Sequence, residues 1–455
     1  MAECPNPRRL ERTARFARFA HRRHIHAQPD RVRAVPRQTA GRQEEALDRT
    51  ASPDSGDVQP LRILGIAPTS FFADYGCHVR IRGHLTALSA RGHQVLLITY
   101  PSGRDVAGLR TVRAPWPAGS RVQVGSSRLK IALDVVLGPT ALAAALRFRP
   151  DLIHAYLHEG ALIGAVIGAL LRRPLVFDFQ GSLTGEMLDH RFIAPESAWL
   201  GVLRRLERWI DRRPDAVLAS SAHATHLLGE QYDVPPARIH SLPDSVDPDL
   251  FRPVDAFSPD ELAGLRARLG VSPGRRLIVY LGLLAPYQGT DLLLEALAIL
   301  AARRDDVHLL LMGFPFVDRY RARAQALGLT DRVTFTGQVP YEAAPAHLAL
   351  GHVAVAPKLS ATEGSGKVLT YMAAALPVAA FDTPVHREYL GDHGVYAAAG
   401  DAAALANALA ELLADPKRAA ARGRALRERV MTTYTWPRAA ALIEGVYSIT
   451  LQHSR

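Results

Sequence analysis

Residues 275–284 read RRLIVYLGLL, a strongly aliphatic run that is followed by a helical stretch at about 289–303. The alternation of apolar run and helix continues to residue 400, with the further runs VHLLLMGF (307–314), RVTFTGQV (332–339), HVAVAPKL (352–359), PVAAFD (377–382) and GVYAAAG (394–400). Continuous apolar strands that alternate with helices are typical of a parallel sheet covered by helices on both faces. The pattern therefore predicts a doubly wound α/β domain over residues 251–435.

The preceding part of the chain repeats this pattern, with helical stretches near 78–90 and 160–172. Its apolar runs are LRILGIA (61–67), HQVLLITY (93–100), DLIHAYL (151–157), PLVFDFQG (174–181) and AVLASS (216–221). We predict a second doubly wound domain over 61–250, with the last helix, in 436–455, packing back on it. Ligands bind at the carboxyl ends of parallel strands, so we expect the site in a cleft between the two facing domains.

The composition indicates a soluble globular protein, since 48% of the 455 residues are hydrophobic and 22% are charged. The longest uninterrupted apolar run, Ala161–Leu171, is shorter than the roughly 20 residues that cross a bilayer, so we expect no membrane span. No secretory signal is recognisable at the N-terminus. Cys4 and Cys77 cannot form a disulfide framework and favour a reducing, cytoplasmic compartment.

The formal net charge of +11 comes almost entirely from arginine, because the lysines are only Lys130, Lys358, Lys367 and Lys417. No nucleic-acid recognition module accompanies this charge, and we expect no nucleic-acid partner. Residues 1–60 are rich in arginine and poor in aliphatic side chains, which predicts a disordered tail; a short membrane-touching helix is the alternative. The apolar stripe of 199–213 predicts a helix packed on the sheet, with an anionic membrane surface as the alternative partner.

The segment ATEGSGKVLTYMAAALPVAAFD (361–382) predicts a strand end, a loop of small residues and a helix that begins near Ser365. Such a helix start presents unpaired backbone N–H groups to an anion, Gly364 and Gly366 permit its close approach, and Lys367 adds a positive charge. Glu363 stands in the mouth of this loop, where a carboxylate can bind sugar hydroxyls. The string GSGK is not a P-loop, because alanine and valine replace the glycine and hydroxyl residue that the motif requires.

In order and spacing, the segments from 61 to 450 resemble a retaining glycosyltransferase of family 4, with the GT-B architecture of two Rossmann-like domains facing a cleft. The resemblance is carried by RGHQVLLITY, PDLIHAYLHEGALIGA, VLASS, LPDSVDPDLFRP, VYLGLLAPYQGTDLLLEAL, the 361–382 segment and YTWPRAAALIEGVY. It implies an acceptor domain at 61–250 and a donor-nucleotide domain at 251–435.

The resemblance also assigns donor residues in the second domain. It implies that Glu363 orients the donor sugar, that Lys367 with Gly364, Ser365 and Gly366 holds the phosphates, and that Thr370 contacts the ribose. Thr370 replaces a glutamate of the family pattern, and Leu283 and Gln288 replace its arginine and lysine phosphate clamp. Gly282 and Gln288 remain donor-site candidates beside the turn.

In the first domain, Gly76 matches the family's loop after the first strand, and His78 follows it at the start of a helix. Gln180 stands where the family often has a histidine, which makes Asp178 and Gln180 candidates for contact with the sugar or acceptor; for Asp178 a structural salt bridge is an equal alternative. We expect Glu186 and His158 to line the cleft. We expect no metal site, although His154 and His158 are four residues apart.

These features predict transfer of a sugar, with retention, from a nucleoside-diphosphate sugar to a hydroxyl of a cell-envelope glycan, lipid or metabolite. We expect no cofactor or metal and a cytoplasmic protein, with peripheral contact to the inner face of an anionic membrane as a further option. The alternatives are a nucleotide-sugar epimerase of GT-B fold and a degenerate, non-catalytic binding subunit.

Overall fold

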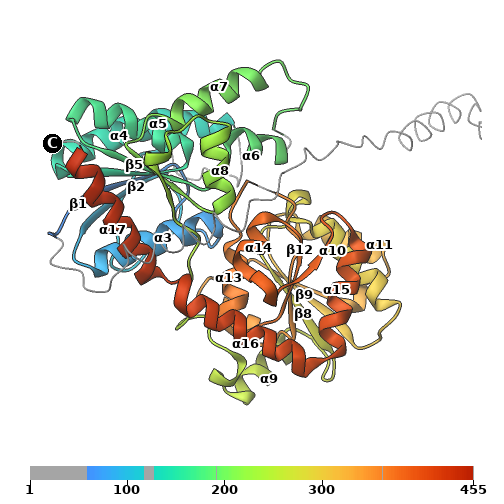
Figure 1. Cartoon of the computed structure of the whole chain (residues 1–455). Helices are drawn as coiled ribbons and strands as arrows, with labels where there is room; N and C mark the ends of the chain where they lie inside the picture. Colours follow the sequence, from blue (N-terminus) through green and yellow to red (C-terminus); the bar gives the residue numbers. More distant parts are fainter. Residues whose placement is uncertain (1–58, 117–127, 191, 361, 454–455) are drawn as a thin grey trace, which may run out of the picture. The chain divides into compact units, whose positions relative to one another are not determined.

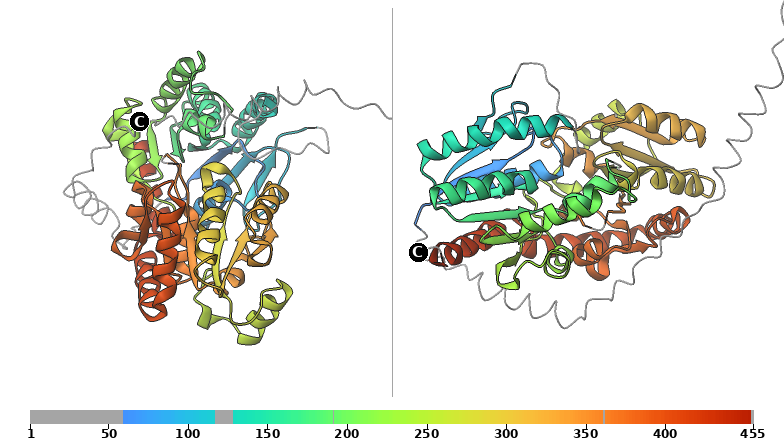
Figure 2. Two further views of the ribbon diagram at one scale, coloured as in Figure 1. Left: turned by 90° about the vertical axis from the view of Figure 1, so that its right-hand side faces the viewer. Right: turned by 90° about the horizontal axis from the view of Figure 1, so that it is seen from above.

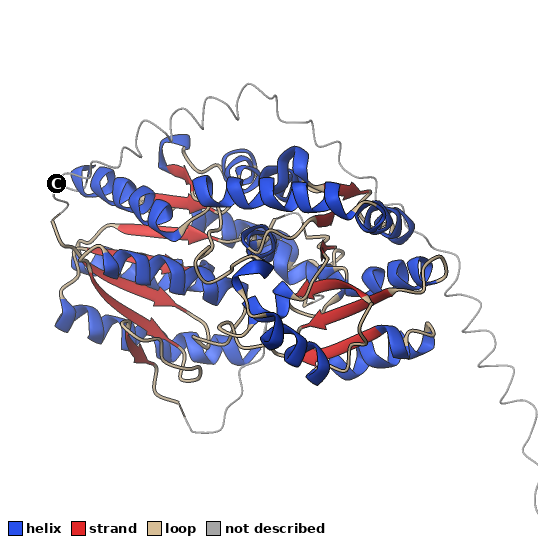
Figure 3. Cartoon of the chain, turned by 90° about the horizontal axis from the view of Figure 1, so that it is seen from below, coloured by secondary structure: helices blue, strands red, loops and turns tan. Residues whose placement is uncertain are grey.

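The computed structural model describes residues 59–116, 128–190, 192–360 and 362–453 (Figure 1). Their helices and strands form two parallel sheets with helices on both faces, and Figure 3 shows the strands of each sheet between layers of helices. We call residues 59–250 the N-lobe and residues 251–435 the C-lobe. The expected fold class of two doubly wound domains is confirmed; the predicted disordered tail lies outside the described residues.

The N-lobe sheet has the strand order β3-β2-β1-β4-β5-β6-β7, and all its pairings are parallel. The order reverses between β1 and β4, so two crossover connections leave the sheet in opposite directions there and open a crevice at the strand ends. The strands are β1 (Arg62–Ala67), β2 (Gln94–Thr99), β3 (Arg110–Arg113), β4 (Leu152–Tyr156), β5 (Leu175–Phe179), β6 (Ala216–Ala219) and β7 (Ile239–Ser241).

Helices cover both faces of this sheet because its strands are apolar on both sides. One face carries α4 (Arg128–Phe148), α5 (Leu157–Leu171), α7 (Leu200–Asp211) and α8 (Ala222–Glu230), and Figures 1 and 2 show the first three side by side. The other face carries α3 (Gly76–Ala90) and the C-terminal helix α17 (Trp436–His453), whose Ile443 and Tyr447 are buried in the same core as Ile81 and Leu85. The short helix α6 (Leu183–Asp189) follows β5.

The C-lobe sheet has the order β10-β9-β8-β11-β12-β13 and reverses between β8 and β11. Its strands are β8 (Arg276–Leu281), β9 (Val307–Met312), β10 (Val333–Gly337), β11 (Val353–Ala356), β12 (Val378–Phe381) and β13 (Val395–Ala397). Its helices are α9 (Pro259–Arg268), α10 (Thr290–Ala301), α11 (Val317–Ala326), α12 (Ala344–Ala349), α13 (Gly366–Ala373), α14 (Pro384–Leu390), α15 (Ala402–Ala414) and α16 (Pro416–Thr433). The core on one face includes residues of α10, α11 and α15, and that on the other includes residues of α13, α14 and α16.

Helix α4 corrects one expectation. By length and mean composition its segment Leu129–Phe148 qualifies as a membrane-spanning helix, and it is the one such helix among the described residues. The search for an uninterrupted apolar run did not find this segment, because Lys130 and Asp134 lie within it. We treat α4 as a sheet-packing helix because Leu133 and Leu137 are fully buried in the N-lobe core.

Helix α7 corrects another expectation, that its apolar stripe packs on the sheet. Trp199, just before the helix, and Val202 and Trp209 are 70%, 50% and 44% exposed, whereas the buried face contains Glu207 and Asp211. The stripe is therefore divided: Ile210 is buried in the N-lobe core as expected, but most of the stripe faces outward because the two carboxylates pair with a buried histidine under the helix.

Candidate active site

The two points of strand-order reversal face a common pocket of about 290 Å³. The loop after β1 and the first turn of α5 line it from the N-lobe, and the loops after β8 and β11 line it from the C-lobe. Ligands of doubly wound domains bind at such reversal points, because the loops on either side diverge there. The position of the pocket therefore follows from the topology of both sheets.

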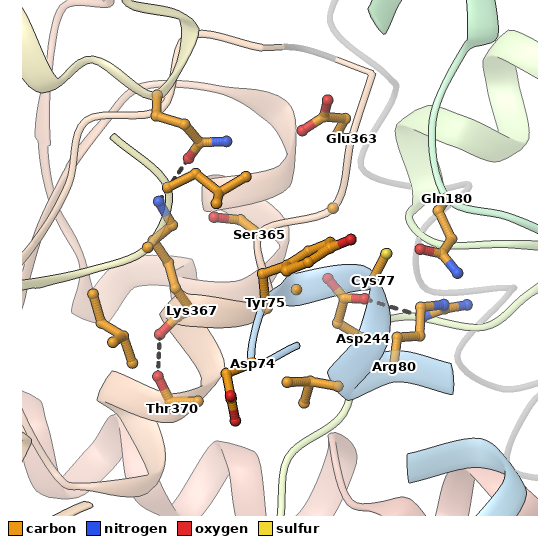
Figure 4. A pocket seen from close by; sticks show the side chains of 18 of the residues that line it. Asp74, Tyr75, Cys77, Arg80, Gln180, Asp244, Glu363, Ser365, Lys367 and Thr370 are labelled. Carbon is orange, nitrogen blue, oxygen red and sulfur yellow. Dashed lines mark hydrogen bonds and ion pairs between the residues drawn. The ribbon is translucent and has the colours of Figure 1, made fainter. Parts of the chain in front are cut away.

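The C-lobe wall is built by the loop that connects β11 to α13 (Figure 4). Lys358, at the beginning of this loop, is 4% exposed; its Nζ lies 2.7 Å from Glu363 Oε2 and donates to the carbonyl of Gly364. This pair fixes the Glu363 carboxylate, which is 17% exposed, at the mouth of the pocket. Ser365, the N-cap residue of α13, makes no capping bond through its side chain, so the first turn keeps free backbone N–H groups.

Lys367 reaches from the first turn of α13 towards the turn after β8. Its Nζ donates to Gln288 Oε1 at 2.7 Å and to the Tyr280 hydroxyl at 3.2 Å, and it lies 4.5 Å from the centre of the Tyr280 ring. Burial and the charge of Lys358 lower the pKa of Lys367 to about 7, although Glu363 opposes the change. The neutral amine of Lys367 is therefore poised to gain a proton when an anion enters.

Two glycines in this wall permit close approach. Gly282 has a φ of 154°, and a Cβ there would lie 2.8 Å from Lys367 Nζ. A Cβ on Gly364 would overlap the carboxylate of Asp244, which belongs to the N-lobe. Gly364 thus permits the loop that connects β11 to α13, which we call the donor loop, to touch the N-lobe at the edge of the pocket.

The N-lobe wall rests on a buried ion-pair network around Arg80 of α3. The Arg80 guanidinium contacts both oxygens of Asp178, the shortest distance being 2.6 Å, and donates to Asp244 Oδ1 at 3.1 Å and to the carbonyl of Leu242. Burial raises the pKa of Asp178, but Arg80 lowers it by more, to about 2. Gln180 donates from Nε2 to Asp178 Oδ2 at 2.8 Å, which fixes the amide at the pocket.

Glu186 of α6 also lines the pocket and faces the donor loop. A Cβ placed on Gly181 would lie 3.0 Å from Glu363 Cγ and 3.3 Å from Glu186 Oε1, so the two carboxylic side chains flank this glycine. Burial and the charge of Glu363 raise the pKa of Glu186. The pocket therefore contains one carboxyl group from each lobe, Glu186 and Glu363, and the two flank Gly181.

The pocket brings together most of the residues expected from the sequence. Those that line it are Gly76, Gln180, Glu186, Gly282, Gln288, Glu363, Gly364, Ser365, Gly366, Lys367 and Thr370. Thr370 donates its hydroxyl hydrogen to the carbonyl of Lys367 at 2.7 Å, which leaves its oxygen lone pairs for a ligand.

Asp178, His78 and His158 are not among the lining residues. Asp178 is fully buried, and its oxygens are used by Arg80 and Gln180, so the expected contact with sugar or acceptor is replaced by a structural role. His78 is also fully buried; its Nδ1 accepts from the backbone N–H of Ala73, its Nε2 bonds to a threonine hydroxyl, and burial lowers its pKa to about 3.

His158 lies under α7 instead of in the cleft. Its Nε2 is 3.2 Å from Asp211 Oδ1 and 3.7 Å from Glu207 Oε1, and its ring stands edge-on to Phe177 and Phe179. Burial lowers the pKa of His158, but the two carboxylates raise it by more, to about 9. His158 lies in the first turn of α5 with its side chain turned towards the helix layer, so its closeness to the end of β4 does not bring it into the pocket.

Comparison with known proteins bears on the chemistry of this pocket. A model of the glycosyl transferase 4-like domain matches residues 75–244, and a model described as glycosyl transferases group 1 matches residues 275–415. The chain belongs to the group 1, family 4-like glycosyltransferases. The two matches coincide with the two lobes that form the pocket.

Similar glycosyltransferases act on diverse acceptors. The chain is 33% identical over 296 residues to the GDP-mannose-dependent alpha-(1-6)-phosphatidylinositol monomannoside mannosyltransferase of Mycolicibacterium smegmatis, covering 62% of this chain and 74% of that protein. It is 28% identical over 406 residues to the 2-deoxystreptamine glucosyltransferase of Streptomyces kanamyceticus, covering 83% and 99%. The sucrose-phosphate synthase of Thermosynechococcus elongatus has a similar fold, with a TM-score of 0.72, 22% identity and coverage of 86% and 100%.

The chain is thus a glycosyltransferase of the hexosyltransferase class, as expected, and the comparisons favour this activity over the epimerase and the non-catalytic subunit. For this glycosyltransferase, sequence reasoning missed Lys358, Tyr75, Tyr287 and Lys130 as pocket residues. Lys358 had a usable signal, because a lysine at the end of an apolar strand is rare in this lysine-poor chain. Tyr287 lies in a quoted segment but had no role assigned to it, Tyr75 and Lys130 lie outside the quoted segments, and the positions of all three depend on how the chain folds around the pocket.

Proposed function

We propose that this glycosyltransferase transfers a hexosyl group, with retention of anomeric configuration, from a nucleoside-diphosphate sugar to a hydroxyl acceptor. The observation that carries the proposal is the position of Lys367 Nζ, which contacts Gln288 beside Gly282 where the family pattern has its phosphate clamp. One ammonium and the free N–H groups of the α13 start face the position of a diphosphate there. No metal enters this proposal.

The donor sugar lies between the diphosphate and the N-lobe wall. Glu363, held by Lys358, accepts hydrogen bonds from sugar hydroxyls and stabilises the positive charge that develops at the anomeric carbon. Thr370 contacts the ribose, without the charge-assisted bond that a glutamate would make. Lys367 stabilises the negative charge of the departing diphosphate, which is the larger electrostatic requirement of the reaction.

The acceptor enters from the N-lobe side. Gln180, whose amide is fixed by Asp178, and Glu186 offer hydrogen-bonding groups to its hydroxyls, and Lys130 adds a cation at the edge of the pocket. The retained configuration requires the acceptor to approach the face that the diphosphate leaves. The acceptor hydroxyl and the departing diphosphate therefore share the space between Glu363 and Glu186.

A donor panel followed by product analysis tests this function. GDP-mannose is the first donor to assay, because the mannosyltransferase relative is named for it, with UDP-glucose as the second. We expect mass spectrometry to detect hexosyl addition to a hydroxyl acceptor, and NMR to show an anomeric configuration equal to that of the donor. Glu363→Gln should lower kcat by at least about 100-fold in a protein that still folds, with some loss of Tm because Lys358 loses its ion-pair partner, while Glu261→Gln on the exposed face of α9 should match wild type. Unchanged turnover in Glu363→Gln would exclude the site assignment.

We further propose that the enzyme is cytoplasmic and docks on the inner face of an anionic membrane through α4, α5 and α7. Large apolar side chains are exposed on this layer: Ile131, Val135, Leu146, Val166, Leu170, Trp199, Val202, Leu206 and Trp209. Exposed arginines accompany them on and beside α7: Arg204, Arg205, Arg208, Arg212 and Arg213. Apolar insertion combined with arginine charge is the chemistry that binds anionic lipid surfaces.

Vesicle sedimentation tests this contact with phosphatidylglycerol and phosphatidylcholine in equal parts, against pure phosphatidylcholine. We expect binding to the anionic vesicles that weakens with salt, and at least about fivefold weaker binding of a Trp199→Ser, Trp209→Ser variant. Phe316→Ser, which removes an exposed aromatic side chain from the C-lobe, is the matched control. Equal binding of both variants would exclude the α7 contact.

A further inference from the structure

A cluster of three buried metal-ligating side chains lies beneath α7, outside the pocket. His158 comes from the first turn of α5, and Glu207 and Asp211 lie four residues apart on α7, so both carboxylates face the same side of that helix. The side chains are 6%, 0% and 0% exposed. One ligand atom from each residue can be chosen so that all lie within 4.8 Å of one another.

Asp211 is incompletely paired in this cluster. Among the described residues its Oδ2 has no hydrogen-bond partner, and its Oδ1 is met by His158 Nε2 at 3.2 Å. Buried polar atoms are normally paired, and leaving a carboxylate without partners is strongly unfavourable. The Asp211 side chain therefore points to a ligand at this position.

The charges of the cluster point the same way. Two buried carboxylates contribute two negative charges, and within the described part of the chain the ion pairs of Glu207 and Asp211 are made with His158. A protonated imidazole supplies a single positive charge and leaves the cluster with a net negative charge. A divalent cation bound by a neutral imidazole and two carboxylates leaves no net charge.

We propose that His158, Glu207 and Asp211 bind one divalent transition-metal ion, with zinc as the best chemical fit. Zinc is bound by histidine nitrogen and carboxylate oxygen at about 2.0–2.2 Å in tetrahedral sites, so neighbouring donors lie about 3.3–3.5 Å apart. The separations of 3.2 Å and 3.7 Å between His158 Nε2 and the two carboxylates bracket this value. The imidazole ligand disfavours calcium and magnesium, which prefer oxygen alone.

The ion has a structural role, because the cluster is separate from the pocket but supports one of its walls. Glu207 accepts hydrogen bonds from the backbone N–H groups of Leu183 and Thr184 and from the Thr184 hydroxyl, at the first turn of α6. Helix α6 carries Glu186 into the pocket. The metal thereby joins α5, α7 and the start of α6 into one unit, and this role does not depend on the proposed donor or acceptor.

The test uses the full-length protein without an affinity tag, dialysed against a chelator and then loaded with zinc or cobalt(II). We expect about one tightly held zinc per chain by mass spectrometry, a rise in Tm on zinc addition and the intense visible absorption of four-coordinate cobalt(II). The Asp211→Asn variant should hold no zinc and should show no rise in Tm when zinc is added. His226→Gln, which alters an exposed histidine on α8, should keep both.

His158→Gln serves as the second variant if Asp211→Asn does not fold, and it should lose the same equivalent. Residues 1–58 contain further histidines and Cys4 that can hold metal weakly. The difference between wild type and the cluster variants, measured after gel filtration, therefore isolates the α7 site. Wild-type protein that retains no zinc and shows no change in Tm, or cluster variants that retain as much zinc as wild type, would overturn the proposal and leave a buried ion pair.

Discussion

The depressed pKa of Lys367 predicts that donor binding weakens as the pH rises. With a pKa of about 7 in the empty pocket, the Lys367 amine is mostly protonated at pH 6 and mostly neutral at pH 9. The donor diphosphate favours the ammonium form, so its binding raises this pKa. Above pH 7 the donor must therefore bind together with a proton, and affinity falls with increasing pH.

The size of the change in donor affinity follows from the difference between the pH and the pKa of Lys367. At pH 9, protonating a group of pKa about 7 costs about 2.7 kcal/mol, which corresponds to an affinity about 100-fold lower than at pH 6 if the pKa in the complex exceeds 9. The diphosphate of a sugar nucleotide has no group that titrates between these values. Because the pKa of Glu186 in the same pocket is raised to about 8, the Lys367 variants are needed to assign the pH dependence to Lys367.

Isothermal titration calorimetry with GDP-mannose or UDP-glucose, in buffers of different ionisation enthalpy, measures both the affinity and the proton count. We expect uptake of about one proton per chain at pH 8 and almost none at pH 6. Lys367→Arg should bind with little pH dependence because the guanidinium stays charged, and Lys367→Met should bind weakly at every pH. Donor binding without proton uptake at pH 8, and with a flat pH profile in wild type, would refute the placement of the diphosphate at Lys367.

Two further predictions concern a contact between the walls of the pocket and the ion pair within the N-lobe wall. Gly364→Ala places a methyl group against the Asp244 carboxylate and should destabilise the protein by about 1–3 kcal/mol in thermal unfolding. Gly445→Ala in helix α17 meets no atom within 4 Å and should be neutral or stabilising, because alanine favours the helix; equal Tm values for the two variants would contradict the contact. Arg80→Met leaves the buried Asp178 carboxylate without its cation, and chemical denaturation should show that the free energy of unfolding falls by about 3–5 kcal/mol. Adding Asp178→Leu should restore part of this stability. A further loss in the double variant would argue against the ion pair.

Most of the fold was predictable from the sequence because the strands are continuous apolar runs with buried side chains on both faces. Predicted and observed elements differ by a few residues, as for the strand at 93–100, observed at Gln94–Thr99, and the helix at 289–303, observed at Thr290–Ala301. Strands β3 and β7 were missed. They are short edge strands with few fully buried positions, so they lack the periodic signal of the central strands.

The donor half of the site was predictable because its residues lie in one continuous segment. Glu363, Gly364 and Lys367 follow one strand and begin the next helix, so local structure alone brings them to one end of the sheet. The acceptor half depends on side-chain direction, which linear spacing does not determine. His158 follows β4 as expected, yet its side chain turns away from the pocket towards α7.

In this pocket the positive charge for the donor phosphates comes from helix α13 and not from the turn after β8. In the family pattern, two cations stand on the turn after β8; here that turn has Leu283 and Gln288, and Lys367 reaches it from α13. A lysine at the start of a helix adds its charge to the free N–H groups of the same turn, so one flexible side chain and the fixed backbone act on the same anion. This arrangement favours Gly282 beside the ammonium, because a Cβ there would lie only 2.8 Å from Lys367 Nζ and the lysine would have to shift. Gly282→Ala should therefore displace the ammonium and weaken donor binding as much as Lys367→Met, and the two substitutions combined should cost little more than either alone, since both remove the same contact.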